Sequence, residues 1–188
     1  MELIRSRGGV MRAVLTVLGT GAVILLAATV PNALMALKPF IQKRRGKVNE
    51  RSLERVIQRL KGRRMVEFVT HNRKTVLQIT ESGRKRLREF EFEQMKLALP
   101  KPWDGKWTII LFDIPEYKKT ARDALRRKLQ QLGCCQYHRS VFVHPSDCAD
   151  EVDFIAELFN VERHVIHFRT PSLGNQEYRV RKFFRALT

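Results

Sequence analysis

The sequence predicts a mixed α+β fold in two parts, and three observations lead to this expectation. Apolar residues recur at helical spacing between residues 50 and 61. Two short runs, MVEFV and TVLQI, flank a polar stretch, which is typical of a β-hairpin. After Pro100, strand-like and helix-like segments alternate, as they do where helices cover one face of a small sheet.

The helix predicted from Glu50 to Lys61 has one apolar and one polar face. Asn49 is placed as its N-cap, and Gly62 is placed to end it. The apolar residues follow the i, i+3, i+4, i+7 pattern: Leu53, Val56, Ile57 and Leu60. Polar and mostly cationic side chains occupy the opposite face: Arg51, Arg55, Gln58, Arg59 and Lys61. A charged helix face is often only solvated, and this is the simpler interpretation.

The segment after this helix favours a second interpretation, a DNA-binding surface. A basic hairpin follows, and Thr80 can cap a further helix beyond it. The order helix, helix, basic hairpin, helix is that of a winged helix-turn-helix, which we assign to residues 47–99. In such a domain the helix at 50–61 enters the major groove. Further cationic residues beside it are predicted to bind DNA: Arg63, Arg64, Arg73 and Lys74.

Residues 1–46 form an apolar N-terminal helical segment that is open to two interpretations. No charged residue occurs from Ala13 to Leu37, a length sufficient for a helix to span a bilayer. Gly19, Gly21 and Pro31 instead favour buried helices that break at these residues and supply the first elements of the winged helix. In the alternative, residues 13–37 contact or enter the inner membrane and the remaining domains are cytoplasmic.

The charge of the chain indicates a polyanionic partner. Lys and Arg number 36 against 19 Asp and Glu, and the formal net charge of +17 exceeds what solubility alone requires. Double-stranded DNA, RNA and an anionic membrane surface all fit this charge. Three cysteines, Cys134, Cys135 and Cys148, form an odd set without zinc-site spacing. This favours a reducing compartment, and we expect a cytoplasmic protein.

Residues 100–188 form the second predicted domain. Its strand-like segments are 108–112, 135–144 and 164–169, and its helix-like segments are 120–132 and 150–159. Gly133 is placed to stop the first of these helices. The basic run RVRKFFRALT is expected to add a helix at the end. The histidines of this domain are interpreted as structural or surface residues, and its cysteines as small buried side chains.

Three segments of this domain carry a resemblance to a known family. WDGKWTIILFDIPE, ARDALRRKLQQLG and HRSVFVHP resemble the central domain of the PaaX-like repressors of phenylacetate degradation. That domain is similar to the second CRISPR-associated adaptation protein, a small dimer with metal-dependent nuclease activity in some members. The resemblance covers Trp103 to about Thr170. It implies a ferredoxin-like βαββαβ fold and a homodimer formed through this domain.

Asp113 is the one candidate for chemistry. The resemblance implies that an aspartate here, supplied once by each subunit, holds a divalent cation such as Mg²⁺ at the dimer axis. Ser140 and Phe142 match the second-strand pattern of the same relatives. The simpler interpretation is that Asp113, followed by Ile114 and Pro115, closes a strand. A single aspartate is weak support for hydrolysis, so an enzyme is the less favoured prediction.

We therefore expect a dimeric, repressor-like transcriptional regulator that needs no cofactor. Two winged helices, paired through the ferredoxin-like domains, would bind a roughly palindromic duplex site. The alternative is a Mg²⁺-dependent endonuclease, or a nucleic-acid-binding scaffold related to the adaptation nuclease.

Overall fold

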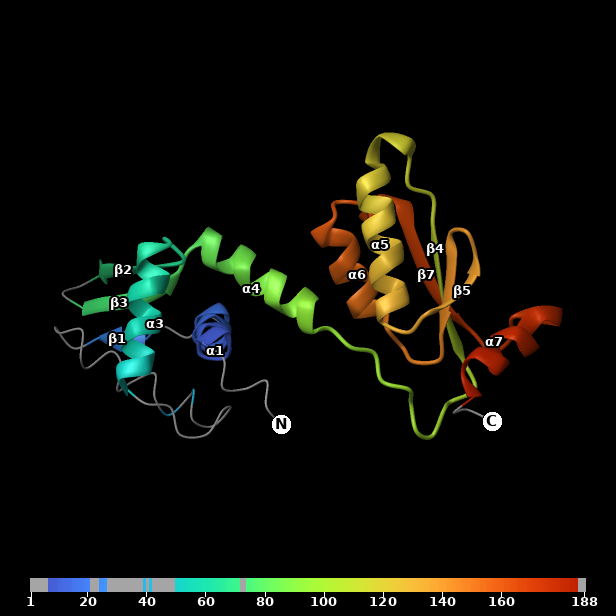
Figure 1. Ribbon diagram of the computed structural model, residues 1–188, viewed down its shortest axis with the longest axis horizontal. Coiled ribbons are helices and arrows are strands. Elements are labelled where there is room, and N and C mark those ends of the chain that lie inside the picture. Colours follow the sequence, from blue (N-terminus) through green and yellow to red (C-terminus); the bar gives the residue numbers. More distant parts are fainter. Residues whose placement is uncertain are drawn as a thin grey trace. The chain divides into compact units, whose positions relative to one another are not determined.

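The computed structural model describes residues 7–20, 24–26, 39, 41, 50–71 and 74–185. The chain divides into two compact units, Met1–Glu93 and Gln94–Thr188 (Figure 1). The apolar N-terminal segment therefore belongs to the same unit as the predicted helix-and-hairpin region. The second unit begins six residues before the predicted boundary at residue 100.

The first unit combines helices with an antiparallel sheet. Its described elements follow in chain order: α1 (Arg7–Gly19), β1 (Ile24–Leu26), α3 (Glu50–Gly62), β2 (Val66–His71), β3 (Lys74–Ile79) and α4 (Glu81–Gln94). The strands lie in the order β1-β3-β2, and both pairings are antiparallel. The predicted helix at 50–61 and the predicted hairpin are both confirmed. Asn49, the expected N-cap, lies outside the described residues.

One apolar core joins the N-terminal helix to the rest of this unit. Val14 and Leu15 of α1 are buried together with Leu53 and Leu60 of α3. The apolar stretch 13–37 is not one continuous helix, because α1 ends at Gly19 and β1 pairs with β3. Among the described residues, no helix has the length and apolar character needed to cross a membrane.

A compact junction connects α3, β2 and α4. Gly62 ends α3, but the residue that reverses the chain is Arg64, which adopts a left-handed φ of 54°. Met65 N–H then bonds Leu60 O at 2.9 Å, the Schellman pattern that normally uses glycine. Thr80 caps α4 as predicted, because its Oγ1 accepts a hydrogen bond from Gly83 N–H at 3.2 Å.

The second unit has the βαββαβ order that the resemblance implies, whereas the sequence pattern alone indicated three strand-like segments. Its sheet strands are β4 (Trp107–Phe112), β5 (Cys135–His138), β6 (Val141–His144) and β7 (Val165–Thr170). Its α-helices are α5 (Lys119–Gln131), α6 (Ala149–Leu158) and α7 (Glu177–Phe183). Short 3₁₀ turns occupy Glu116–Lys118, Glu162–His164 and Gly174–Gln176. All pairings in the sheet order β5-β6-β4-β7 are antiparallel.

The segment 135–144 differs from the sequence analysis, which recognised strand character but no division. It forms two strands that turn at Arg139 and Ser140. The turn contains neither glycine nor proline, so the usual turn signals are missing.

Helices cover the two faces of this sheet unequally (Figure 1). On one face, Gln130 of α5 bonds Gln136 at 3.1 Å, and Asp153 of α6 bonds His167 at 2.8 Å. On the other face, Val180 and Phe184 pack with Trp107 in a separate core cluster. That cluster occupies only one end of the second face.

Candidate nucleic-acid interface

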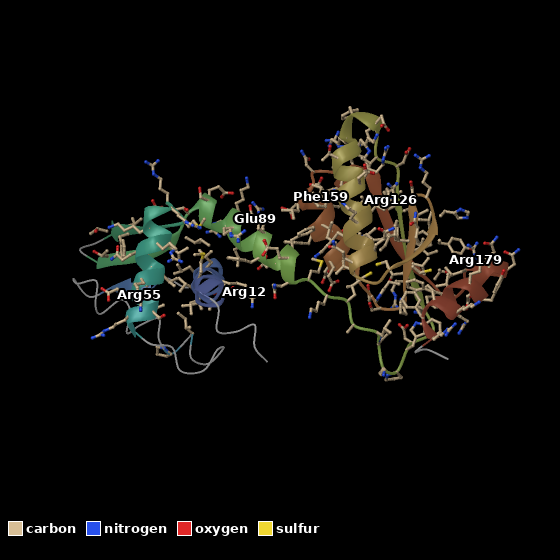
Figure 2. The ribbon with its side chains drawn as sticks, in the orientation of Figure 1. Arg12, Arg55, Glu89, Arg126, Phe159 and Arg179 are labelled. Atoms are coloured by element: carbon tan, nitrogen blue, oxygen red, sulfur yellow. The ribbon has the colours of Figure 1, made fainter. Side chains whose placement is uncertain are left out.

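The outer face of α3 exposes the side chains that the sequence analysis singled out. The exposed side chains of this helix are four cations, one amide and one carboxylate: Arg51, Arg55, Arg59, Lys61, Gln58 and Glu54. Arg55, labelled in Figure 2, donates from Nε to the carbonyl oxygen of Arg51 at 3.1 Å. This bond uses one donor and leaves the two terminal nitrogens of Arg55 available to bind an anion. Lys61 Nζ lies 5.2 Å from the centre of the Phe68 ring, a cation–π contact that limits its reach.

The inner face of α3 fixes the orientation of these cations. Leu53, Ile57 and Leu60 are almost completely buried against the core that α1 shares. Rotation of the helix about its axis would expose these side chains and cost about 1.5–3 kcal/mol for each. The outer face is therefore presented by a fixed helix.

The structure describes some of the predicted DNA-binding residues outside α3. Arg63 and Arg64 are exposed immediately after α3. The carbonyl oxygen of Arg64 accepts a hydrogen bond from Thr80 Oγ1 at 2.6 Å, which ties the backbone here to the start of α4. Arg73 lies outside the described residues, and Lys74 is described only as the first residue of β3, paired with His71.

Two further cations at the start of α4 were not among the predicted DNA-binding residues. Arg84 and Lys85 are exposed, whereas Arg86 binds Glu89 at 2.6 Å and Arg88 lies 3.5 Å from Glu81. No ion pair involves Arg84 or Lys85 within the described ranges of the first unit. The sequence alone does not distinguish Arg84 and Lys85 from Arg86 and Arg88, because ion pairing depends on side-chain geometry.

The excess charge is concentrated in the first unit. Residues 1–93 contain twenty of the 36 Lys and Arg residues but only eight of the 19 acidic residues. The first unit thus carries most of the attraction for a polyanion.

Asp113 lies at the end of β4, beside an open depression of about 400 Å³. Its side chain is exposed, and its backbone N–H bonds His164 O at 3.0 Å. The depression has an apolar floor that includes Leu111 and Ile166, and its polar lining residues are Asp113, Ser140, Arg163 and His164. Phe142 does not line it, because this side chain is buried and stacks on Phe112, 6.0 Å between centroids.

The residues around Asp113 do not form a metal site within one chain. No group of three or more His, Cys, Asp or Glu residues suited to a metal ion occurs in the described part of the chain. A divalent cation held by Asp113 would need ligands from elsewhere, such as a second subunit.

The other titratable groups of the second unit have structural surroundings. Burial lowers the pKa of His144 to about 4, and Ser146 N–H donates to His144 Nδ1 at 3.1 Å. The imidazole is therefore neutral at pH 7. All three cysteines are free and buried, and burial raises the pKa of Cys148 to about 12, which confirms their interpretation as small buried side chains.

Part of the second sheet face remains apolar and exposed. Leu111, Val141, Ile166 and Phe168 share this face through their pairing, and we call them the open sheet face. Ile166 is 65% exposed and Phe168 is 47% exposed. Both belong to β7, which is an edge strand of the sheet. Exposed apolar groups of this size on one face are typical of a surface that another protein covers.

Comparison with known proteins gives a match within the second unit. The family model for the PaaX protein central Cas2-like domain matches residues 100–180. No curated protein matches the chain.

Proposed function

Residues 100–180 match the family model for the PaaX protein central Cas2-like domain, and from this match we propose that the protein is a DNA-binding transcriptional regulator of the repressor type. The first unit would be a winged helix-turn-helix that reads duplex DNA. The second unit would pair two copies of the chain. The single observation that carries the proposal is the cationic outer face of α3, mounted on a buried apolar face.

The element order supports the winged-helix assignment. A helix with one buried and one cationic face precedes a two-stranded hairpin, and a third strand completes a small antiparallel sheet. The major groove of B-DNA is wide enough for one helix with its side chains. Gln58 and Arg59 are exposed in the C-terminal half of α3, and we propose that they reach base edges. Glutamine pairs well with adenine and arginine with guanine.

The cations outside α3 would contact phosphates. Arg63 and Arg64 follow the helix, and Arg84 and Lys85 lie at the start of α4. Phosphate contacts set the position of a protein on duplex DNA without specifying sequence, and they make affinity fall with salt. Each contact contributes about −0.9 to the slope of log affinity against log salt concentration.

Dimerisation through the open sheet face would bring two copies of α3 to one DNA site. A second copy is the occupant we propose, because the exposed residues form an apolar patch at an edge strand of the domain. Two half-sites add their binding free energies, so a pair of short helices can discriminate sequences that one cannot. Analytical ultracentrifugation of Ile166→Glu tests this role. A monomer is expected, and an unchanged dimer would exclude this face.

Duplex binding is tested with Arg55→Ala and Arg59→Ala, each compared with Arg127→Ala. Arg127 is an exposed cation of α5, so its removal changes the net charge equally without touching α3. Genomic footprinting of the tagged protein supplies the target duplex. Both α3 variants should bind it more weakly than Arg127→Ala does, and a lost base contact of Arg59 should cost about 1–3 kcal/mol. Equal effects from all three variants would exclude α3 as the reading element.

A nuclease remains the second candidate, since Asp113 is exposed beside a depression that adjoins the open sheet face. The test is incubation of DNA and RNA with Mg²⁺ or Mn²⁺, with Asp113→Ala alongside. Cleavage that disappears in the variant would support an enzyme. Cleavage that persists would indicate a contaminant.

A further inference from the structure

Helix α7 has two distinct faces. Val180 and Phe184 are buried, and Phe184 lies 6.1 Å from Trp107 between ring centroids. Tyr178 and Phe183 face outward, at 67% and 57% exposure. These rings are among the few large apolar side chains that the described residues leave exposed, and their burial would normally be favourable.

Cations accompany the two exposed rings. Arg179, labelled in Figure 2, and Lys182 are both exposed on the same helix. Arg179 donates from Nη1 to the neutral Gln176 Oε1 at 2.8 Å, so its charge is not paired with a carboxylate by this bond. Glu177, the one acidic residue of α7, is turned away from them. It accepts hydrogen bonds from Leu173 N–H at 3.1 Å and from Arg181 Nε at 2.7 Å. The exposed surface of α7 is therefore aromatic and cationic, without a carboxylate.

The helix is held firmly on the sheet. The Arg181 guanidinium lies 5.0 Å from the Trp103 ring centroid and 5.8 Å from that of Trp107. Phe183 meets Phe184 edge to face, with centroids 4.8 Å apart. These contacts hold the backbone of α7 in place and restrict the Phe183 ring before any ligand arrives, which lowers the entropy cost of binding.

The geometry points to a second nucleic-acid contact on α7, at which Tyr178 and Phe183 stack on unpaired bases and Arg179 and Lys182 bind the neighbouring phosphates. Aromatic rings interspersed with cations are the usual means of binding single-stranded nucleic acid. In a duplex the base faces are covered by their neighbours, so the rings favour single strands. This surface belongs to the second unit and does not depend on the role proposed for α3.

A lipid surface fits α7 less well. A helix that lies in a membrane interface needs a continuous apolar face, and the apolar face of α7 is already buried against Trp107. The two remaining rings are too few to replace it.

The experiment measures fluorescence anisotropy of labelled oligothymidylate and oligouridylate of about 15 nucleotides, the upper range of such sites. The full chain is compared with Tyr178→Leu, Tyr178→Phe and Phe183→Leu. The matched control is Tyr117→Leu, because Tyr117 is 82% exposed but its neighbouring lysines are occupied. Lys118 donates to Asn160 O, and Lys119 lies 3.8 Å from Glu116. Unchanged tryptophan fluorescence verifies folding, since Trp103 and Trp107 lie beside α7.

We expect each leucine variant on α7 to bind single strands about fivefold or more weakly, and Tyr178→Phe to retain affinity. Duplex affinity should change little. A loss on either oligonucleotide supports the contact, and the larger loss identifies the strand chemistry. The proposal is overturned if Tyr117→Leu has the same effect, if phenylalanine does not restore affinity, or if duplex affinity falls equally. Binding of the same variants to phosphatidylserine vesicles is measured in parallel. The proposal is also overturned if the variants lose binding to these vesicles but not to the oligonucleotides.

Discussion

His144 provides a pH-dependent test of the second unit. Its imidazole is buried at the end of β6, and Nδ1 accepts hydrogen bonds rather than donating them. Protonation would place a charge in the core and remove the acceptor for Ser146 N–H. Both effects favour the neutral form, in agreement with a pKa lowered from 6.5 to about 4.

The sign of the effect follows from proton binding. Below pH 6.5 the unfolded chain binds a proton at His144 that the folded chain does not bind until about pH 4. Stability of the second unit should therefore fall as pH is lowered through this window. At about 1.36 kcal/mol per pKa unit, the loss approaches 3 kcal/mol.

Urea unfolding followed by tryptophan fluorescence measures this loss, because both tryptophans of the chain lie in the second unit. His144→Asn is the matched variant, since its side-chain oxygen can still accept from Ser146 N–H. The difference in unfolding free energy between the two proteins should change by most of this amount between pH 7 and pH 4. Parallel pH profiles would refute the argument, whatever the stability of the variant at pH 7.

Three substitutions test other contacts. Gly83→Ala should destabilise the first unit by about 1–3 kcal/mol, because a Cβ would lie 2.1 Å from Met65 O; no loss in thermal unfolding by circular dichroism would contradict this contact. Gly62→Ala is its control within the same unit and should stabilise by about 0.5–1 kcal/mol, since a Cβ meets nothing within 4 Å. Asp104→Ala should lower the urea midpoint of the tryptophan signal, because the Asp104 carboxylate accepts hydrogen bonds from both terminal nitrogens of Arg169, at 2.8 and 3.0 Å. An unchanged midpoint would show that this pair adds no stability.

Strong periodicity made some elements predictable. Helix α3 was expected at 50–61 because four apolar residues at helical spacing mark one buried face: Leu53, Val56, Ile57 and Leu60. In the structure it ends one residue later, at Gly62. The alternating segments indicated three strands and two helices of the second unit, and only the resemblance implied the fourth strand of its βαββαβ order.

Other features depend on tertiary contacts that a sequence pattern does not contain. Gly19 marked the end of α1 as predicted, but the uncharged stretch 13–37 carried no alternation that would indicate the strand β1. Gly62 is the obvious candidate to reverse the chain after α3, yet Arg64 adopts the left-handed conformation. Ile166 and Ile110 lie on opposite faces of one sheet, and only the packing of the helices shows which remains exposed.

Hydrogen–deuterium exchange in the presence and absence of the target duplex is the most direct test of the central claim. Bound DNA should slow exchange in α3, at residues 50–62, and in the turn that follows it, while the helices α5 and α6 remain unaffected. Slowed exchange confined to the second unit, with α3 unchanged, would contradict the assignment of α3 as the helix that reads DNA.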